Sequence, residues 1–249
     1  MDRAKLSWIG HGDWLYWNPI EAGALEESLA SLSLGASDQV LDVGCGKGAA
    51  LLFLAERCGC RGLGVDLHRR AVAHAEEQAR QRSLEKRLEF RIEAADPGEW
   101  PEAEFALALC LGASHALGGF EASLQVFHSK LKPGGWALIG EGYWKQNPAE
   151  EYLTFLGMQK EELKTFEETA ETARRAGFEV LSGRPTSEPE WRRYEETYQR
   201  RVLQWAEDHP DDPQAAPFRR HILSWRRAYQ LWGLKTLGFG LYLLRKPEA

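Results

Sequence analysis

The chain has 249 residues, of which 43% are hydrophobic and 27% are charged, and its formal net charge at pH 7 is −6. This is the composition of a globular domain, and a dedicated nucleic-acid binder is usually basic instead. No apolar run approaches the roughly 20 residues of a membrane span, and no secretory signal follows the N-terminus. We therefore expect a cytoplasmic protein with no membrane and no nucleic-acid partner.

The four cysteines indicate neither a metal centre nor a redox motif. Cys58 and Cys60 are separated by a single residue, and Cys45 and Cys110 lie in apolar, strand-like surroundings. Neither arrangement has the spacing of a zinc site or a redox pair. We expect reduced thiols and no bound metal.

The N-terminal region combines an aromatic leader with one predicted helix. The helix opens at Asn18-Pro19-Ile20-Glu21, because Asn18 can cap it and proline suits the first helical position. Gly35 is placed to end it. The leader contains Trp8, His11, Trp14, Tyr16 and Trp17 and follows no clear period. His11 and Tyr16 would reach over a site if this segment folds as a lid.

Short apolar runs then alternate with helical stretches. Strands are predicted over 40–43, 62–65, 88–92, 105–111, 137–140, 178–181 and 239–244. Helices are predicted after the first strand and over about 69–83, 122–131 and 161–175. This alternation indicates an α/β fold, with a parallel sheet and helices on both faces. Ligands of such sheets bind at the carboxyl ends of the strands.

One stretch interrupts the alternation between the last two strands. Two helical segments there each carry a single apolar stripe, and the connector His209-Pro210-Asp211-Asp212-Pro213 has turn composition. The aromatic residues of the stripes are Trp191, Tyr194, Tyr198, Trp205, Phe218, Trp225, Tyr229 and Trp232. The pattern predicts an inserted helical hairpin whose rings either pack in a core or line a substrate pocket.

The sharpest motif is Leu41-Asp42-Val43-Gly44-Cys45-Gly46-Lys47-Gly48, between a strand and a helix. Glycines there permit a tight turn and let a ligand approach main-chain amides. Asp66 ends the next strand, where a carboxylate can accept both hydroxyls of a ribose, although a helix cap is an alternative role. Asp96 follows the third strand and can accept from the amine of adenine. NAD fits the glycines and Asp66 as well as other adenosine ligands do.

Taken in order, these motifs resemble class I S-adenosylmethionine-dependent methyltransferases. The family's acidic residue followed by G-x-G-x-G is matched by Asp42, Gly44, Gly46 and Gly48. Asp66 and Asp96 match its second and third motifs, and Leu131-Lys132-Pro133-Gly134-Gly135 resembles its turn into the fifth strand. Gly112-Ala113-Ser114-His115 and Gly140-Glu141-Gly142-Tyr143-Trp144 look like an uncharacterised bacterial subgroup of small-molecule-type methyltransferases.

The resemblance implies a Rossmann-like, seven-stranded, mostly parallel sheet whose antiparallel last strand is inserted beside the fifth. It implies one methyltransferase domain over 1–249. Its parts would be the aromatic leader and helix (1–36), a cofactor-binding core (37–185), an inserted helical cap (186–233) and the last strand (234–249). The implied cofactor is S-adenosyl-L-methionine. The implied cofactor residues are Asp42, Gly44, Cys45, Gly46, Gly48, Asp66, Leu67, Asp96 and Leu111.

Methyl transfer from a sulfonium depends mainly on proximity and orientation, and a general base is needed only when the nucleophile carries a proton. The candidates for acceptor chemistry are His115, Glu141 and Tyr143. Imidazole has a suitable pKa range, but His115 would equally pack beside the adenine. Glu141 would equally form a salt bridge or a cap.

Three readings of function follow from the sequence. The first is a methyltransferase acting on a small molecule. The second is an NAD-dependent oxidoreductase, and the third is a non-catalytic protein that binds S-adenosylmethionine. The acidic charge disfavours RNA as an acceptor. An exposed aromatic stripe on the hairpin would be a surface on which a homodimer could form.

Overall fold

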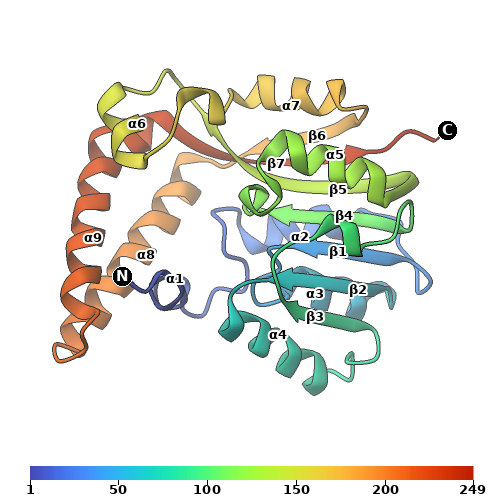
Figure 1. Ribbon diagram of the computed structural model, residues 1–249, viewed down its shortest axis with the longest axis horizontal. Helices are drawn as coiled ribbons and strands as arrows, with labels where there is room; N and C mark the ends of the chain where they lie inside the picture. Colours follow the sequence, from blue (N-terminus) through green and yellow to red (C-terminus); the bar gives the residue numbers. More distant parts are fainter. Residues whose placement is uncertain (249) are drawn as a thin grey trace.

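A seven-stranded sheet in the order β3-β2-β1-β4-β5-β7-β6 organises the computed structural model, which describes residues 1–248 (Figure 1). The strands are β1 (Gln39–Val43), β2 (Arg61–Asp66), β3 (Leu88–Ile92), β4 (Phe105–Leu111), β5 (Leu131–Trp144), β6 (Glu179–Pro185) and β7 (Leu237–Arg245). Strand β7 is antiparallel to both β5 and β6, and the other neighbouring pairs are parallel. The predicted fold class is confirmed, including the last strand beside the fifth.

Helices cover both faces of this sheet. They are α2 (Ala22–Ala30), α3 (Ala49–Cys58), α4 (Arg69–Gln81), α5 (Phe120–Lys130) and α7 (Phe166–Arg175). Helix α6 (Glu150–Leu156) instead packs at the end of the sheet, where its Tyr152 meets Trp144 and Ala228. One core cluster joins α2, α3 and α4 to the sheet through residues such as Leu25, Leu51 and Val72. A second cluster joins α5 and α7 to the opposite face through Leu124 and Ala173. The central strand β4 is apolar throughout because it is buried on both sides.

The insertion before β7 is the predicted helical hairpin, formed by α8 (Glu188–Asp208) and α9 (Ala215–Ala228). A π-helical turn (Tyr229–Gly233) and α10 (Leu234–Thr236) lead from it into β7. The start of α8 carries a capping box, in which the Ser187 side chain accepts from the Glu190 amide and the Glu190 side chain accepts from the Ser187 amide. The two helices extend past the carboxyl ends of β1, β2 and β4.

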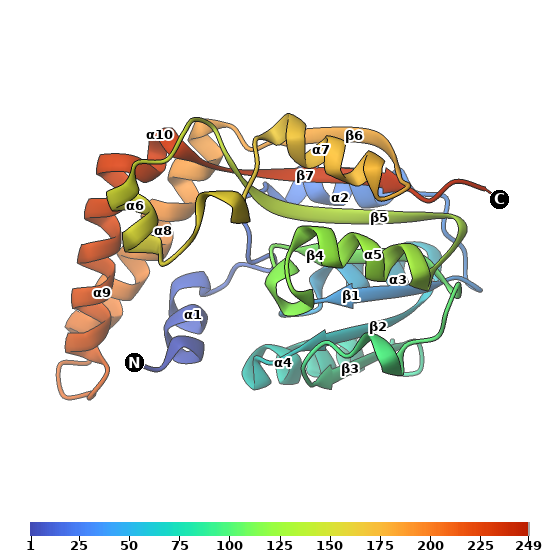
Figure 2. The same cartoon turned by 45° about the horizontal axis from the view of Figure 1, so that its top comes forward.

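Helix α1 (Arg3–His11) lies between this hairpin and the sheet, as both views show (Figures 1 and 2). It contacts α8 over much of its length. The aromatic leader, which has no clear period in sequence, therefore contains a helix that the sequence did not predict. Its weak period is explained by contacts on two sides, with the hairpin and with the sheet edge.

Several predicted boundaries were wrong. The helix expected at Asn18 begins at Ala22, because the side-chain Oδ1 of Asn18 accepts from the Ile20 amide in a local turn at 2.9 Å. This helix ends at Ala30, before Gly35. The helix expected over 161–175 is a single turn (Lys160–Glu162) followed by α7, and α6 was not predicted. At Asn18 and at Gln159, local hydrogen bonds replace a turn of the expected helix.

Within the described residues the four cysteines form no disulfide. No group of three or more His, Cys, Asp or Glu side chains is arranged over residues 1–248 to hold a metal ion. None of the helices in this part of the chain combines the length and the apolar character needed to cross a membrane. The final residue of the predicted segment 234–249 lies outside the described residues.

Candidate active site

A cavity of about 360 Å³ lies at the carboxyl ends of β1, β2 and β4. Its floor comes from the glycine turn after β1 and from the end of β2. Its sides come from the loops after β3 and β4, and its roof comes from the N-terminal segment. The wall includes the predicted cofactor residues Asp42, Gly44, Cys45, Gly46, Asp66, Leu67 and Leu111. The sheet thus brings together residues that are far apart in the chain, at the edge where such folds bind ligands.

The glycine turn is held in a conformation that other residues rarely adopt. Gly44, Gly46 and Gly48 have φ angles of 73°, 51° and 70°. A Cβ atom on Gly44 would lie only 2.2 Å from the Cβ of Ala113. A Cβ on Gly48 would lie 2.6 Å from the ring of Phe90, and Gly48 does not line the cavity. Gly44 is therefore required by the approach of the β4 loop, whereas Gly48 is required for packing of α3 on the sheet.

Asp66 joins the glycine turn to the end of β2. Its Oδ2 accepts from the Gly46 amide at 2.8 Å, and its Oδ1 accepts from the His68 amide at 2.7 Å. Helix α4 is capped by His68, whose Nδ1 accepts from the Ala71 amide at 3.2 Å. Asp66 is therefore not the helix cap. Each carboxylate oxygen keeps a lone pair available to a ligand hydroxyl.

Asp42 is the most deeply buried acid of this site, with 3% of its surface exposed. Burial raises its pKa to about 8, and the nearby Asp66 carboxylate contributes to the rise. Burial likewise raises the pKa of the Cys45 thiol. Asp42 and Cys45 are therefore largely protonated at neutral pH, and a cationic ligand group would favour ionisation of Asp42.

The loop after β3 reaches the cavity with residues that differ from the prediction. Asp96 is exposed, lies outside the cavity wall, and uses Oδ1 to accept from the Gly98 amide at 2.9 Å. Glu93, Ala94 and Ala95 line the cavity instead. The structure does not bring Asp96 to the site, because its carboxylate caps the turn at 97–99. No sequence motif marks Glu93 as a residue of the cavity wall.

The three candidates for acceptor chemistry lie in different surroundings. His115, in a short turn after β4, lines the first cavity and also a second cavity of about 400 Å³. Glu141, at the end of β5, lines only the second cavity; its Oε2 is buried without a partner in the described residues. Burial raises the pKa of this carboxyl. Tyr143 is buried against Phe166 at 5.3 Å between ring centroids and lines neither cavity.

The roof of the first cavity is the N-terminal segment. It contributes Ser7, His11, Leu15, Tyr16, Trp17 and Asn18. The His11 ring stacks on Trp17 with 4.6 Å between centroids, and its Nε2 lies 2.9 Å from the Tyr194 hydroxyl. Burial lowers the pKa of His11 to about 4, so the ring is neutral at physiological pH. His11 and Tyr16 thus cover the site, as expected of a lid, but Ser7, Leu15, Trp17 and Asn18 were not predicted.

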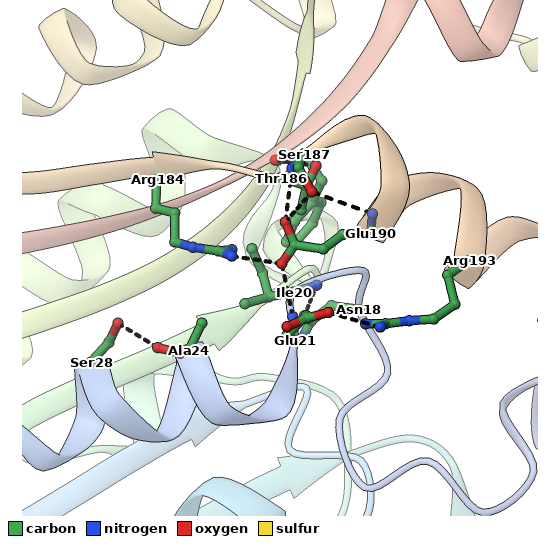
Figure 3. Close-up of polar contacts among 11 residues, drawn as sticks. Asn18, Ile20, Glu21, Ala24, Ser28, Arg184, Thr186, Ser187, Glu190 and Arg193 are labelled. Carbon is green, nitrogen blue, oxygen red and sulfur yellow. Dashed lines mark hydrogen bonds and ion pairs between the residues drawn. The ribbon is translucent and has the colours of Figure 1, made fainter.

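A buried carboxylate fixes the lower end of this segment to the hairpin (Figure 3). Glu190, with 6% of its surface exposed, accepts from Arg184 Nη2 at 2.6 Å and from the Ser187 amide at 2.8 Å. It also accepts from the Glu21 amide at 3.4 Å, and Arg193 pairs with the Glu21 carboxylate at 2.8 Å. These contacts hold the start of α2 against the first turn of α8, directly after the residues that line the cavity.

The aromatic rings of the hairpin do not line this cavity. Phe218 and Val202 form a separate core with Leu6 of α1. Tyr198 packs so closely beneath Gly10 that a Cβ there would lie 2.2 Å from its ring. The reading in which the stripes form a core is supported, and the hairpin supports the roof from behind.

Comparisons with known proteins agree with this geometry. Residues 40–135 match the family described as a methyltransferase domain. The chain is 28% identical to the protein YjhP of Escherichia coli (strain K12), over 98% of this chain and 99% of that protein. It is 24% identical to the 27-O-demethylrifamycin SV methyltransferase of Amycolatopsis mediterranei (strain S699), over 96% and 90% of the two chains.

Among solved structures, a SAM-dependent methyltransferase from Geobacter sulfurreducens in complex with S-adenosyl-L-homocysteine has a TM-score of 0.86. It shares 28% identity, and the match covers 96% of this chain and 97% of that one. The fold, the glycine turn and these relatives define a class. The chain is an S-adenosylmethionine-dependent methyltransferase.

Proposed function

We propose that the chain transfers a methyl group from S-adenosylmethionine to a small-molecule acceptor bound beneath the N-terminal segment. The observation that carries the proposal is the roofed cavity at the carboxyl ends of β1, β2 and β4. A roof built from α1 and residues 15–18 leaves room for a compact acceptor and disfavours a protein or RNA surface. The relative that methylates 27-O-demethylrifamycin SV supports an acceptor of small size.

The residues present fit the cofactor. The positive φ angles at Gly44 and Gly46 keep side chains away from the cavity floor, as a closely approaching ligand requires. Asp66 retains acceptor capacity for two ribose hydroxyls. Asp66 and Glu93 on the cavity wall give negative surroundings that suit a sulfonium and an ammonium group, and a bound cation would favour ionisation of the buried Asp42. Of the predicted cofactor residues, Asp96 and Gly48 have no place on this wall.

The bound cofactor supplies a methyl group that is already activated by its sulfonium. The chain then orients two reactants and excludes water. Tyr16 and Trp17 of the roof enclose the reaction space, and His115 stands between the two cavities at its side. His115 takes a proton from the acceptor when the nucleophile carries one. Glu141 faces the second cavity, which His115 also lines, whereas Tyr143 has a packing role.

Isothermal titration calorimetry tests the cofactor assignment. The protein is titrated with S-adenosylmethionine, S-adenosylhomocysteine and NAD, and the titrations are repeated on Asp66→Ala and Asp96→Ala. We expect the first two ligands to bind and NAD not to bind. Asp66→Ala should weaken binding roughly 10- to 100-fold, as expected for loss of hydrogen bonds to a charged group, while the matched Asp96→Ala variant should bind as the parent does. Binding of NAD alone would contradict the proposal.

A screen of small molecules for S-adenosylhomocysteine production then identifies the acceptor. With an acceptor in hand, His115→Gln should lower kcat roughly 100-fold or more if this residue is the base. The affinity for S-adenosylhomocysteine should stay the same. An unchanged kcat would assign His115 to packing beside the cofactor.

A further inference from the structure

Lys47 belongs to the glycine motif, yet its side chain does not line the cavity. Only 5% of its surface is exposed. Its Nζ donates to the Gly12 carbonyl oxygen at 2.5 Å, and it lies 5.1 Å from the ring centroid of Trp8 and 6.0 Å from that of Trp17. Within residues 1–248 no carboxylate forms an ion pair with it. The glycine turn thus directs a buried cation into the N-terminal segment.

Such an arrangement is unfavourable for folding alone. Removal of an ammonium group from water carries a penalty of several kcal/mol. One carbonyl and two indole faces compensate for only part of it, and burial lowers the pKa of Lys47. A methionine side chain would fill much of the same space without this penalty. The role of the charge therefore lies in the two parts of the cavity that Lys47 links, and not in stability.

Lys47 connects the floor of the cavity to its roof. Gly12 follows α1, whose His11 and Ser7 line the cavity from above. A second contact of the same kind comes from the other cofactor loop: His68 Nε2 lies 2.9 Å from the Ala4 carbonyl oxygen, and its ring stacks on Trp8. Because His68 Nδ1 accepts from the Ala71 amide, Nε2 is the donor toward α1. Both links start from loops that also carry proposed cofactor contacts.

We propose that Lys47 is a positioning residue that couples the N-terminal segment (3–18) to the glycine turn, so that closure of this segment and cofactor binding form one equilibrium. This inference rests on the proposed cofactor site. A ligand that contacts both floor and roof binds the closed state, and its apparent Kd rises as the closed fraction falls. Lys47 acts by holding Gly12 and the two indoles, without touching the ligand.

The test is Lys47→Met, which keeps an unbranched apolar stem and removes the charge. We expect the Kd for S-adenosylhomocysteine to rise roughly tenfold or more, the scale of a hydrogen bond to a charged group. The Tm of the ligand-free protein should stay equal or increase, because the desolvation penalty is gone. In hydrogen exchange of the ligand-free proteins, residues 3–18 should be less protected in the variant than in the parent, and saturating S-adenosylhomocysteine should restore the protection.

Lys5→Met is the matched control, because Lys5 also lies over an indole, 4.7 Å from the centroid of Trp205, and pairs with Asp212 on the hairpin side of α1. Its affinity for S-adenosylhomocysteine should equal that of the parent. Lys47→Arg, which keeps a cation over the indoles, should retain most of the affinity.

Three results would overturn the inference. The first is unchanged affinity in Lys47→Met, and the second is a lowered Tm with protection of residues 3–18 intact, which would mean a purely structural role. If Lys47→Met does not fold, Trp8→Leu removes the same contact from the side of the roof. The third result is an unchanged affinity for S-adenosylhomocysteine in Trp8→Leu. Failure of the parent protein to bind S-adenosylhomocysteine would instead overturn the proposed function.

Discussion

Two regions of this molecule are rich in aromatic residues, and they have different roles. The N-terminal segment carries Trp8, Trp14, Tyr16 and Trp17, and several of its side chains line the cavity. The hairpin α8–α9 carries more rings, arranged in clear helical stripes, and none of them lines that cavity. The regular stripes belong to packing between helices, whereas the irregular segment belongs to the site.

The difference has a physical origin. A helix with a single apolar stripe buries it against one neighbour, so its sequence shows a period. The N-terminal segment contacts two neighbours at once. His11 bonds to Tyr194 of the hairpin and stacks on Trp17 of the roof, and Lys47 holds Gly12 from below. A segment used on several sides shows no single period, and here this absence marks the functional region.

The largest expected effect is a loss of stability when the core of the hairpin is disrupted. Phe218→Ala removes a fully buried ring from the core shared by α8, α9 and Leu6. The free energy of unfolding should fall by about 3–5 kcal/mol, as for other buried aromatic residues, measured by urea denaturation. The protein that remains folded should still bind S-adenosylhomocysteine within about threefold of the parent. A larger loss of affinity at small loss of stability would mean that the hairpin contributes to the site directly.

Gly10→Ala tests the contact between the two regions. A Cβ at this position would lie 2.2 Å from the ring of Tyr198, so α1 must move away from α8. We expect a loss of about 1–3 kcal/mol in unfolding free energy, typical of overpacking, and a weaker affinity for S-adenosylhomocysteine because the roof shifts. Gly23→Ala is the matched control: nothing lies within 4 Å of the added Cβ in α2, and it should stabilise by about 0.5–1 kcal/mol. Unchanged stability and affinity in Gly10→Ala would show that the N-terminal segment does not depend on its contact with the hairpin.

Acidification should weaken the contact between the N-terminal segment and the hairpin by protonating His11, which lies 2.9 Å from the Tyr194 hydroxyl. The folded protein keeps His11 neutral down to about pH 4, whereas an unfolded histidine takes up a proton near pH 6.5. Stability therefore falls as the pH drops through this window, by about 2 kcal/mol between pH 7 and pH 5.

The measurement compares unfolding free energies of the parent and of His11→Gln at both pH values. The variant should lose less stability on acidification. Asp42, whose raised pKa acts in the opposite direction, is present in both proteins and cancels. Equal pH dependence would show that His11 titrates normally in the folded state.

Much of the cavity floor was predictable from sequence. The glycines and acids that follow β1 and β2 carry short, local motifs whose geometry depends on neighbouring residues. Asp96 shows the limit of this reasoning: the expected acid is present, but its carboxylate caps a turn and Glu93 lines the wall instead. Tyr143, two residues from Glu141 on the same strand, packs against Phe166 and lines no cavity.

The sequence by itself determined the strand and helix alternation, the class of sheet, the glycine turn, the acid that ends β2 and the hairpin. These follow from local periodicity and from backbone requirements that a few adjacent residues satisfy. Only the tertiary structure decided which aromatic region covers the cavity, that His115 stands between two cavities, and that Lys47 points into the roof. Those features depend on segments far apart in the chain, as in the contact of His11 with Tyr194 across 183 residues, and no local pattern records such contacts.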